Sequence, residues 1–253
     1  MVVLYQPIVT LPDHRVFSVE ALARLITPGG DVVGPAAFIP RAEELGLIGR
    51  LGLHVLDTAL RDSNRISAAV GREIPVAVNV SASQVDDELP EFVAQALAAA
   101  GVPARRLILE LTESLLAEGH EAFGAVLDRI RGMGCQIALD DFGTGYSSLS
   151  YLAGLPVDLM KIDKSFVGRL GTSGESFALV RTLLQLAQNL GLATVAEGVE
   201  TVEQADILRG MNCTRAQGYL FARPMPLAEL EAVLELGNGV LPVATSRGGA
   251  PNR

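Results

Sequence analysis

Residues 135–149, with the sequence CQIALDDFGTGYSSL, contain the pattern around which the rest of the chain can be interpreted. The apolar run Ile137–Leu139 is bounded by polar residues and predicts a short buried strand. Asp140 and Asp141 follow directly, and the two glycines after them predict a tight turn. Neighbouring side chains at a strand end diverge, so these acids can face two cations. The alternative is an Asp turn that bonds only its own backbone.

Short apolar runs and amphipathic helical runs alternate on both sides of this stretch. Strands are expected at 4–9, 16–25, 74–80, 107–111, 136–139, 159–162, 193–196 and 214–219, and helices at 48–64, 91–100, 121–133, 176–190, 202–209 and 227–236. This α/β alternation favours a mostly parallel sheet with helices outside, and a closed TIM-like barrel suits this strand number better than a doubly wound sheet. The first two runs, joined by a short turn, predict an antiparallel opening pair.

Composition limits the class of protein and the kind of partner. The length of 253 residues suits one barrel domain, expected over residues 1–236, and the Gly- and Pro-rich stretch 237–253 is expected to form a flexible tail. The formal net charge of -9 argues against duplex nucleic acid or an anionic membrane as main partner. Two isolated cysteines and the absence of a leader or a long apolar run predict a cytoplasmic protein with reduced thiols.

Polar side chains stand in or directly after seven different apolar strands. They are Glu20, Asn79, Glu110, Asp140, Lys161, Glu197 and Gln217. In a barrel, groups at the carboxyl ends of several strands converge on one face. Each residue taken alone also suits a cap or a loop. A carboxylate inside an apolar strand, as in Leu109–Leu111, costs free energy to bury unless it is paired or bound to a metal.

The balance of charge at these positions predicts a cation site. Asp141 joins the four acids at the strand ends, so five negative charges would face the single lysine. Oxygen ligands without Cys or His favour Mg²⁺ or Mn²⁺ over zinc, and Ca²⁺ is the non-catalytic alternative. Arg24 follows Glu20 by four residues on the same strand face, where its guanidinium suits a phosphate. The alternative for Arg24 is an ordinary surface ion pair.

Eight sequence blocks, in order, carry a resemblance to a known family. They are YQPIV at 5–9, EALAR at 20–24, NVS at 79–81, LELTES at 109–114, LDDFGTGYSSL at 139–149, KIDKSFV at 161–167, VAEGVET at 195–201 and QGYLFARP at 217–224. Together they resemble the EAL-domain cyclic di-GMP phosphodiesterases over most of the chain. Two departures, Ala23 and Leu25, replace the bulkier Leu and Trp often seen in that family's second block, and we expect them to affect packing or base contacts rather than metals.

The resemblance implies a modified (β/α)8 barrel with one antiparallel strand, and hydrolysis of cyclic di-GMP to linear pGpG by two-metal activation of water with Mg²⁺ or Mn²⁺. Ca²⁺ is expected to inhibit. The implied metal ligands are Glu20, Asn79, Glu110, Asp140, Asp141, Glu197 and Gln217, the implied catalytic residues are Lys161, Glu197 and Glu20, and the implied substrate contacts are Gln6, Leu22, Arg24 and Asp163. Lys161 would hold the attacking water or help to deprotonate it, and Glu113 would stabilise the loop 142–149. A homodimer is implied as well.

Two other functions remain open at this point. Some relatives of this kind are receptors that bind cyclic di-GMP without cleaving it, but such proteins lose acids or the DDFGTG loop, and this chain keeps them all. An unrelated aldolase- or enolase-type barrel would need a Schiff-base lysine or a different set of acids. Family members commonly carry sensory or GGDEF modules before this domain, so the chain can be an excised domain or a stand-alone one.

Overall fold

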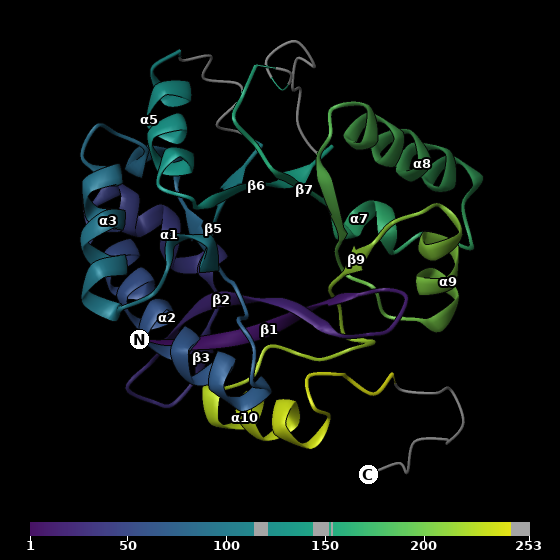
Figure 1. Ribbon diagram of the computed structural model, residues 1–253, viewed down its shortest axis with the longest axis horizontal. Helices are drawn as coiled ribbons and strands as arrows, with labels where there is room; N and C mark the ends of the chain where they lie inside the picture. The colour runs from purple at the N-terminus through teal and green to yellow at the C-terminus, as the bar shows by residue number, and fades with distance from the viewer. Residues whose placement is uncertain (114–120, 144–151, 153, 244–253) are drawn as a thin grey trace.

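The structure is a computed structural model that describes residues 1–113, 121–143, 152 and 154–243. Its sheet has the strand order β1-β9-β8-β7-β6-β5-β4-β2-β3, and a further pairing of β1 with β2 closes it into a barrel. Strand β1 (Val2–Thr10) runs antiparallel to both of its neighbours, β2 (Val16–Ile26) and β9 (Arg215–Ala216). The predicted barrel with one antiparallel strand is therefore confirmed (Figure 1).

The remaining barrel strands are parallel, and helices form a ring outside them (Figure 1). The strands are β4 (Val76–Val80), β5 (Leu107–Thr112), β6 (Gln136–Phe142), β7 (Leu159–Ile162) and β8 (Ala193–Ala196), and the long helices are α2 (Ile48–Val70), α3 (Leu89–Ala100), α5 (Glu121–Gly132), α8 (Gly174–Asn189), α9 (Val202–Gly210) and α10 (Leu227–Leu236). Within the described ranges, no helix combines the length and the apolar character needed to cross a membrane.

Several short elements were not separated by the sequence patterns. They are β3 (Val32–Val33), α1 (Pro35–Glu44), the 3₁₀ turns η1 (Ala82–Gln84) and η2 (Ala104–Arg106), and α7 (Lys164–Val167). The strand β3 has only two residues, and α7 and the two 3₁₀ turns span about one turn each, so periodicity cannot reveal these four elements. Asp163 defines the start of α7, because its side chain accepts a hydrogen bond from the Ser165 backbone N–H.

A separate cluster of apolar side chains lies inside the barrel, and we call it the floor layer. It consists of Ile8, Ala77, Ile108, Ala138, Leu159 and Val195, with Phe17 and Ala193 packed against it. On the outside of the strands, a larger apolar core packs them against the helices. Side chains alternate along a strand, so the residue two positions from each floor residue also points into the barrel. The floor layer therefore supports the polar side chains at the mouth.

The predicted flexible tail does not begin at Gly237. The residues that follow α10, as far as Val243, return to the β1–β2 hairpin, where the Leu241 backbone N–H donates to the His14 carbonyl at 3.1 Å. The Leu241 side chain is 1% exposed, so its apolar burial holds a segment whose Gly-rich composition suggested looseness. The rest of the predicted tail, 244–253, lies outside the described residues.

Candidate active site

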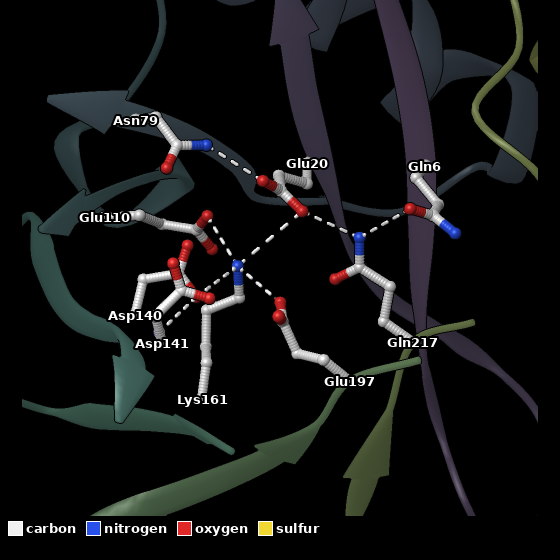
Figure 2. A network of polar contacts seen from close by, with 9 residues as sticks. All are labelled: Gln6, Glu20, Asn79, Glu110, Asp140, Asp141, Lys161, Glu197 and Gln217. Atoms are coloured by element: carbon white, nitrogen blue, oxygen red, sulfur yellow. Dashed lines mark hydrogen bonds and ion pairs between the residues drawn. The ribbon is translucent and has the colours of Figure 1, made fainter. Parts of the chain in front are cut away.

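The polar residues at the strand ends converge at the mouth of the barrel (Figure 2). The sheet register places them at one level, because Gln6 faces Glu20 across β1 and β2, and Asn79 faces Glu110 across β4 and β5. Seven residues singled out by their strand-end positions lie in this group together with Asp141 and Gln6. Their convergence follows from parallel strands that all end on the same side of the barrel.

Lys161 occupies the centre of this group and is almost fully buried. Its Nζ lies 2.8 Å from Glu110 Oε2, 2.8 Å from Glu197 Oε1 and 3.1 Å from Asp140 Oδ1. The fourth carboxylate, Glu20, has its Oε2 at 3.6 Å. One ammonium thus faces four carboxylates in a site of low solvent access, and the excess negative charge favours a bound cation.

The pKa values of the buried groups reflect this crowding. Burial alone would lower the pKa of Lys161, but attraction by the carboxylates, led by Asp140, raises it well above its ordinary value. Burial raises the pKa of Glu110 well above its ordinary value. Burial likewise raises the pKa of Glu197 to about 8, although the nearby Lys161 opposes the shift. Both shifts reflect the cost of placing several negative charges in one buried site.

Glu20 differs from those two acids because side-chain amides stabilise its charge. Asn79 Nδ2 donates to Glu20 Oε1 at 2.8 Å, and Gln217 Nε2 donates to Glu20 Oε2 at 2.7 Å. Burial would raise the pKa of Glu20, but Lys161 and these two hydrogen bonds together lower it below its ordinary value. The two amides thus orient Glu20 and favour its charged form.

The acids form two overlapping groups that could each hold a metal ion. The groups are Glu20, Glu110 and Asp140, and Asp140, Asp141 and Glu197, with candidate ligand atoms within 4.8 Å of one another in each. Asp140 belongs to both. All donors are oxygens, which suits a hard cation such as Mg²⁺ or Mn²⁺. Gln217 Oε1 is buried without a hydrogen-bond partner in the described part of the chain, and a cation or its water shell would satisfy it.

The backbone at the end of β6 and directly after it takes an unusual path. Asp141 has φ +54°, a conformation that Asp tolerates better than most residues, and its N–H donates to Asp140 Oδ1 at 2.9 Å. At Gly143, φ is +101° and a Cβ would come within 2.9 Å of the Phe166 ring, so only glycine fits. The Gly143 N–H donates to Glu113 Oε2 at 2.8 Å, which is the contact expected of a loop tether. The rest of the predicted loop lies outside the described residues.

A cavity of about 310 Å³ opens above the acids. Its lining consists of Gln6, Glu20, Leu22, Asp140, Lys164, Glu197, Gly198, Glu200, Gln217, Gly218 and Tyr219. Of the four expected substrate contacts, Gln6 and Leu22 line it. Arg24 and Asp163 do not: Arg24 Nη1 donates to the Ala23 carbonyl at 2.8 Å, and Asp163 caps α7.

Five residues of this lining were missed from the sequence, namely Gly198, Gly218 and three with larger side chains, Lys164, Glu200 and Tyr219. Lys164 and Glu200 are exposed residues that follow strand ends, and nothing in their local pattern distinguishes them from solvated loop residues. Tyr219 is 49% exposed and has the Arg223 guanidinium carbon 4.0 Å from its ring centroid. The block QGYLFARP at 217–224 was the only sequence signal for Tyr219, and it predicts Gln217 alone as a site residue.

Comparison with known proteins identifies the family. The model of the EAL domain matches residues 1–224. The chain belongs to the EAL domain family. The cyclic di-GMP phosphodiesterase NbdA of Pseudomonas aeruginosa is 42% identical over 231 residues, which are 91% of this chain and 30% of that protein. The chain spans between 28% and 36% of the length of the curated relatives it matches.

Solved EAL structures share both the fold and much of the sequence. The PaMucR phosphodiesterase in complex with c-di-GMP is 40% identical, with a TM-score of 0.85 and coverage of 90% of this chain and 93% of that one. The EAL domain of DcpA from Mycobacterium smegmatis is 37% identical, with a TM-score of 0.81 and coverage of 95% and 99%. The EAL fold is therefore common to this chain and these two structures.

Proposed function

We propose that this EAL domain is an active phosphodiesterase that hydrolyses cyclic di-GMP to linear pGpG with two Mg²⁺ or Mn²⁺ ions. The observation that carries the proposal is the completeness of the site: the five acids, Asn79, Lys161 and Gln217 gather at the barrel mouth. Of these, Glu20, Asp140, Glu197 and Gln217 line the cavity. The similarity to NbdA and to the PaMucR complex supports the choice of substrate.

The metal ions would be held by the two acid groups, with Asp140 shared between them. When bound, they would supply charge stabilisation for the attacking and leaving oxygens of a phosphodiester. Lys161 keeps its proton among the carboxylates. Once cations hold those carboxylates, its Nζ would have a proton with which to donate to a water molecule and orient it. Because the terminal phosphate of pGpG is on a 5′ carbon, the bond that breaks is the one between phosphorus and O3′.

The second candidate is a receptor that binds cyclic di-GMP without cleaving it. The structure favours the enzyme over the receptor, since a receptor has no use for the buried Lys161 and its four carboxylates, which are costly to keep together. A role as the EAL part of a longer signalling protein and a homodimeric state remain predictions. The chain covers 30% of the length of NbdA, which supports the prediction of a longer signalling protein.

The test is to incubate purified protein with cyclic di-GMP and Mg²⁺ or Mn²⁺ and to separate the nucleotides by chromatography. We expect pGpG from the unchanged protein and none from Glu20→Ala. Glu235→Ala, a change on the outer helix α10, is the matched control and should keep full turnover. Tight binding of cyclic di-GMP without linear product under either metal would leave the receptor. Ca²⁺ in place of Mg²⁺ should bind and inhibit.

A further inference from the structure

Two buried side-chain amides form a directed chain of hydrogen bonds at the rim of the site (Figure 2). Gln6 Nε2 donates to the Ala222 carbonyl at 3.0 Å, and Gln217 Nε2 donates to Gln6 Oε1 at 3.0 Å. The same Gln217 nitrogen also donates to Glu20 Oε2 at 2.7 Å. Gln6 and Gln217 are 8% and 4% exposed, so little water competes for these contacts.

The donor-to-acceptor direction of these hydrogen bonds is set by the Ala222 carbonyl. A backbone carbonyl can only accept, so Gln6 must turn its NH₂ group toward Ala222 and its Oε1 toward Gln217. Gln217 must then present its own NH₂ group, whose two protons go to Gln6 and to the Glu20 carboxylate. The Glu20 carboxylate also only accepts, so the orientation of Gln217 is set from two sides, by Glu20 directly and by Ala222 through Gln6.

The acceptor that starts this chain is itself firmly held. Tyr5, the residue before Gln6 on β1, pairs with Met225: the Tyr5 N–H donates to the Met225 carbonyl at 2.8 Å, and the Met225 N–H donates back at 3.0 Å. The Tyr5 side chain is fully buried, and its hydroxyl donates to Asp62 Oδ2 on α2 at 2.6 Å. The segment that carries Ala222 is therefore fixed to the same strand that carries Gln6.

The last atom of this series of hydrogen bonds, Gln217 Oε1, faces the candidate site. With both amide protons used, Gln217 has only Oε1 left, and this buried atom has no partner in the described residues. Figure 2 shows it turned toward the space between Glu20, Lys161 and Glu197. A buried acceptor without a partner normally has a ligand or a water that it waits for.

We propose that Gln6 is a positioning residue that locks the Gln217 amide so that Oε1 serves the metal site. This rests on the proposed function for its effect on turnover, and it assigns Gln6 a role other than the expected substrate contact. Both polar atoms of Gln6 contact a protein partner, so the second Nε2 proton is the donor left for a nucleotide. Without Gln6, the bond to Glu20 alone holds the Gln217 amide, so Oε1 is less firmly directed toward the cation.

The decisive experiment is a double-mutant cycle of Gln6→Met and Gln217→Met, with Gln95→Met on the exposed face of α3 as control. Calorimetry without substrate gives the Mn²⁺ affinity, and kinetics give kcat and KM. Loss of a residue that supports a metal ligand typically costs about 10- to 100-fold in metal affinity or activity. We expect such a loss of affinity and kcat in each single variant and no further loss in the double variant. The control should match the unchanged protein.

Multiplying effects of the two changes, a loss confined to KM, or unchanged Mn²⁺ affinity in Gln217→Met would overturn the proposal. A protein that binds Mn²⁺ but shows no turnover would refute the proposed phosphodiesterase. The Mn²⁺ affinities of the variants would still test the positioning role of Gln6, so the two failures can be told apart.

A second measurement needs no variant in the site. In the unchanged protein, NMR should show slow solvent exchange of the Gln6 and Gln217 side-chain amide protons and fast exchange for Gln95. Fast exchange at Gln6 would refute the lock.

Discussion

The barrel interior contains two layers that differ in nearly every respect although the same strands build both. The floor layer is apolar, and two residues further toward the mouth each strand carries a polar group. The pairs are Ile8 and Gln6, Ala77 and Asn79, Ile108 and Glu110, Ala138 and Asp140, Leu159 and Lys161, and Val195 and Glu197. Two residues along a strand correspond to about 6.5–7 Å, so stability and chemistry are separated by one side-chain layer.

The difference shows how the fold tolerates so much charge. Buried carboxylates destabilise a core that must also pack, but here the packing belongs to the floor and to the outer helices. In the parallel strands the polar residue follows the floor residue in sequence. Strand β1 runs antiparallel, so its polar residue Gln6 precedes its floor residue Ile8. Changes in the upper layer should therefore affect chemistry and charge, and changes in the floor should affect packing.

The largest effect is expected from Lys161→Met. Removing the ammonium should lower kcat by about 10²–10³-fold, the usual cost of losing one preorganised hydrogen-bond donor in an active site. It should also destabilise the metal-free protein by about 3–5 kcal/mol, because the carboxylates around Lys161 lose their counter-ion. Thermal unfolding in EDTA and in Mg²⁺ measures this, and Mg²⁺ should restore much of the stability. Turnover within tenfold of the unchanged protein would remove Lys161 from the mechanism.

Leu159→Ala is the matching change in the floor layer, on the same strand two residues earlier. Leu159 is 2% exposed, and truncating such a buried side chain costs about 2–5 kcal/mol in the free energy of unfolding. Urea denaturation measures that loss. The kcat of the folded fraction should stay near that of the unchanged protein, since no polar atom moves. A stable variant that loses turnover as Lys161→Met does would show that the layers are not separate.

A pH titration of stability separates the layers without any variant. The pKa of Glu197 is raised from 4.5 to about 8, so the folded, metal-free protein binds a proton that the unfolded chain has released. This contribution is present below pH 4.5 and is lost as the pH rises to about 8. The raised pKa of Glu110 acts in the same direction.

Unfolding of the metal-free protein should thus become easier by a few kcal/mol across this window, at about 1.4 kcal/mol per pKa unit. Saturating Mg²⁺ should flatten the dependence, because a bound cation favours the carboxylate, and Glu197→Gln should reduce it. A metal-free protein that grows more stable from pH 5 to 8 would contradict the electrostatic description of the upper layer.

The smallest effect is expected at the tether between Glu113 and Gly143. Glu113→Ala removes the acceptor for the Gly143 N–H and should lower turnover and Mg²⁺ affinity by about tenfold, in the range of residues that support metal ligands. Glu113→Gln keeps an acceptor of the same length and should retain most activity. Steady-state kinetics at several Mg²⁺ concentrations distinguish them. Equal, unchanged kinetics in both variants would remove the tether from the account.

The layers also explain how far the sequence alone could reach. The apolar runs predicted each barrel strand. Burying a charge inside such a run, as at Glu110, costs so much free energy that the charge itself indicated a functional site. Contacts between distant segments leave no such local mark. The Gln6 contact to Ala222 spans 216 positions, and the burial of Leu241 depends on a hairpin at the other end of the chain. Tyr219 and Lys164 were missed because a loop residue is polar whether or not it lines a cavity.

The most direct test of the central claim is a single reversible assay of the unchanged protein. Cyclic di-GMP is supplied first with Mg²⁺, then with EDTA, and then with Mg²⁺ in excess, while pGpG is followed by chromatography. The account predicts that linear product forms, stops and resumes, because the upper layer of the barrel needs cations to act. Product formation that continues in EDTA, or no product at any stage from a protein that binds cyclic di-GMP, would contradict it.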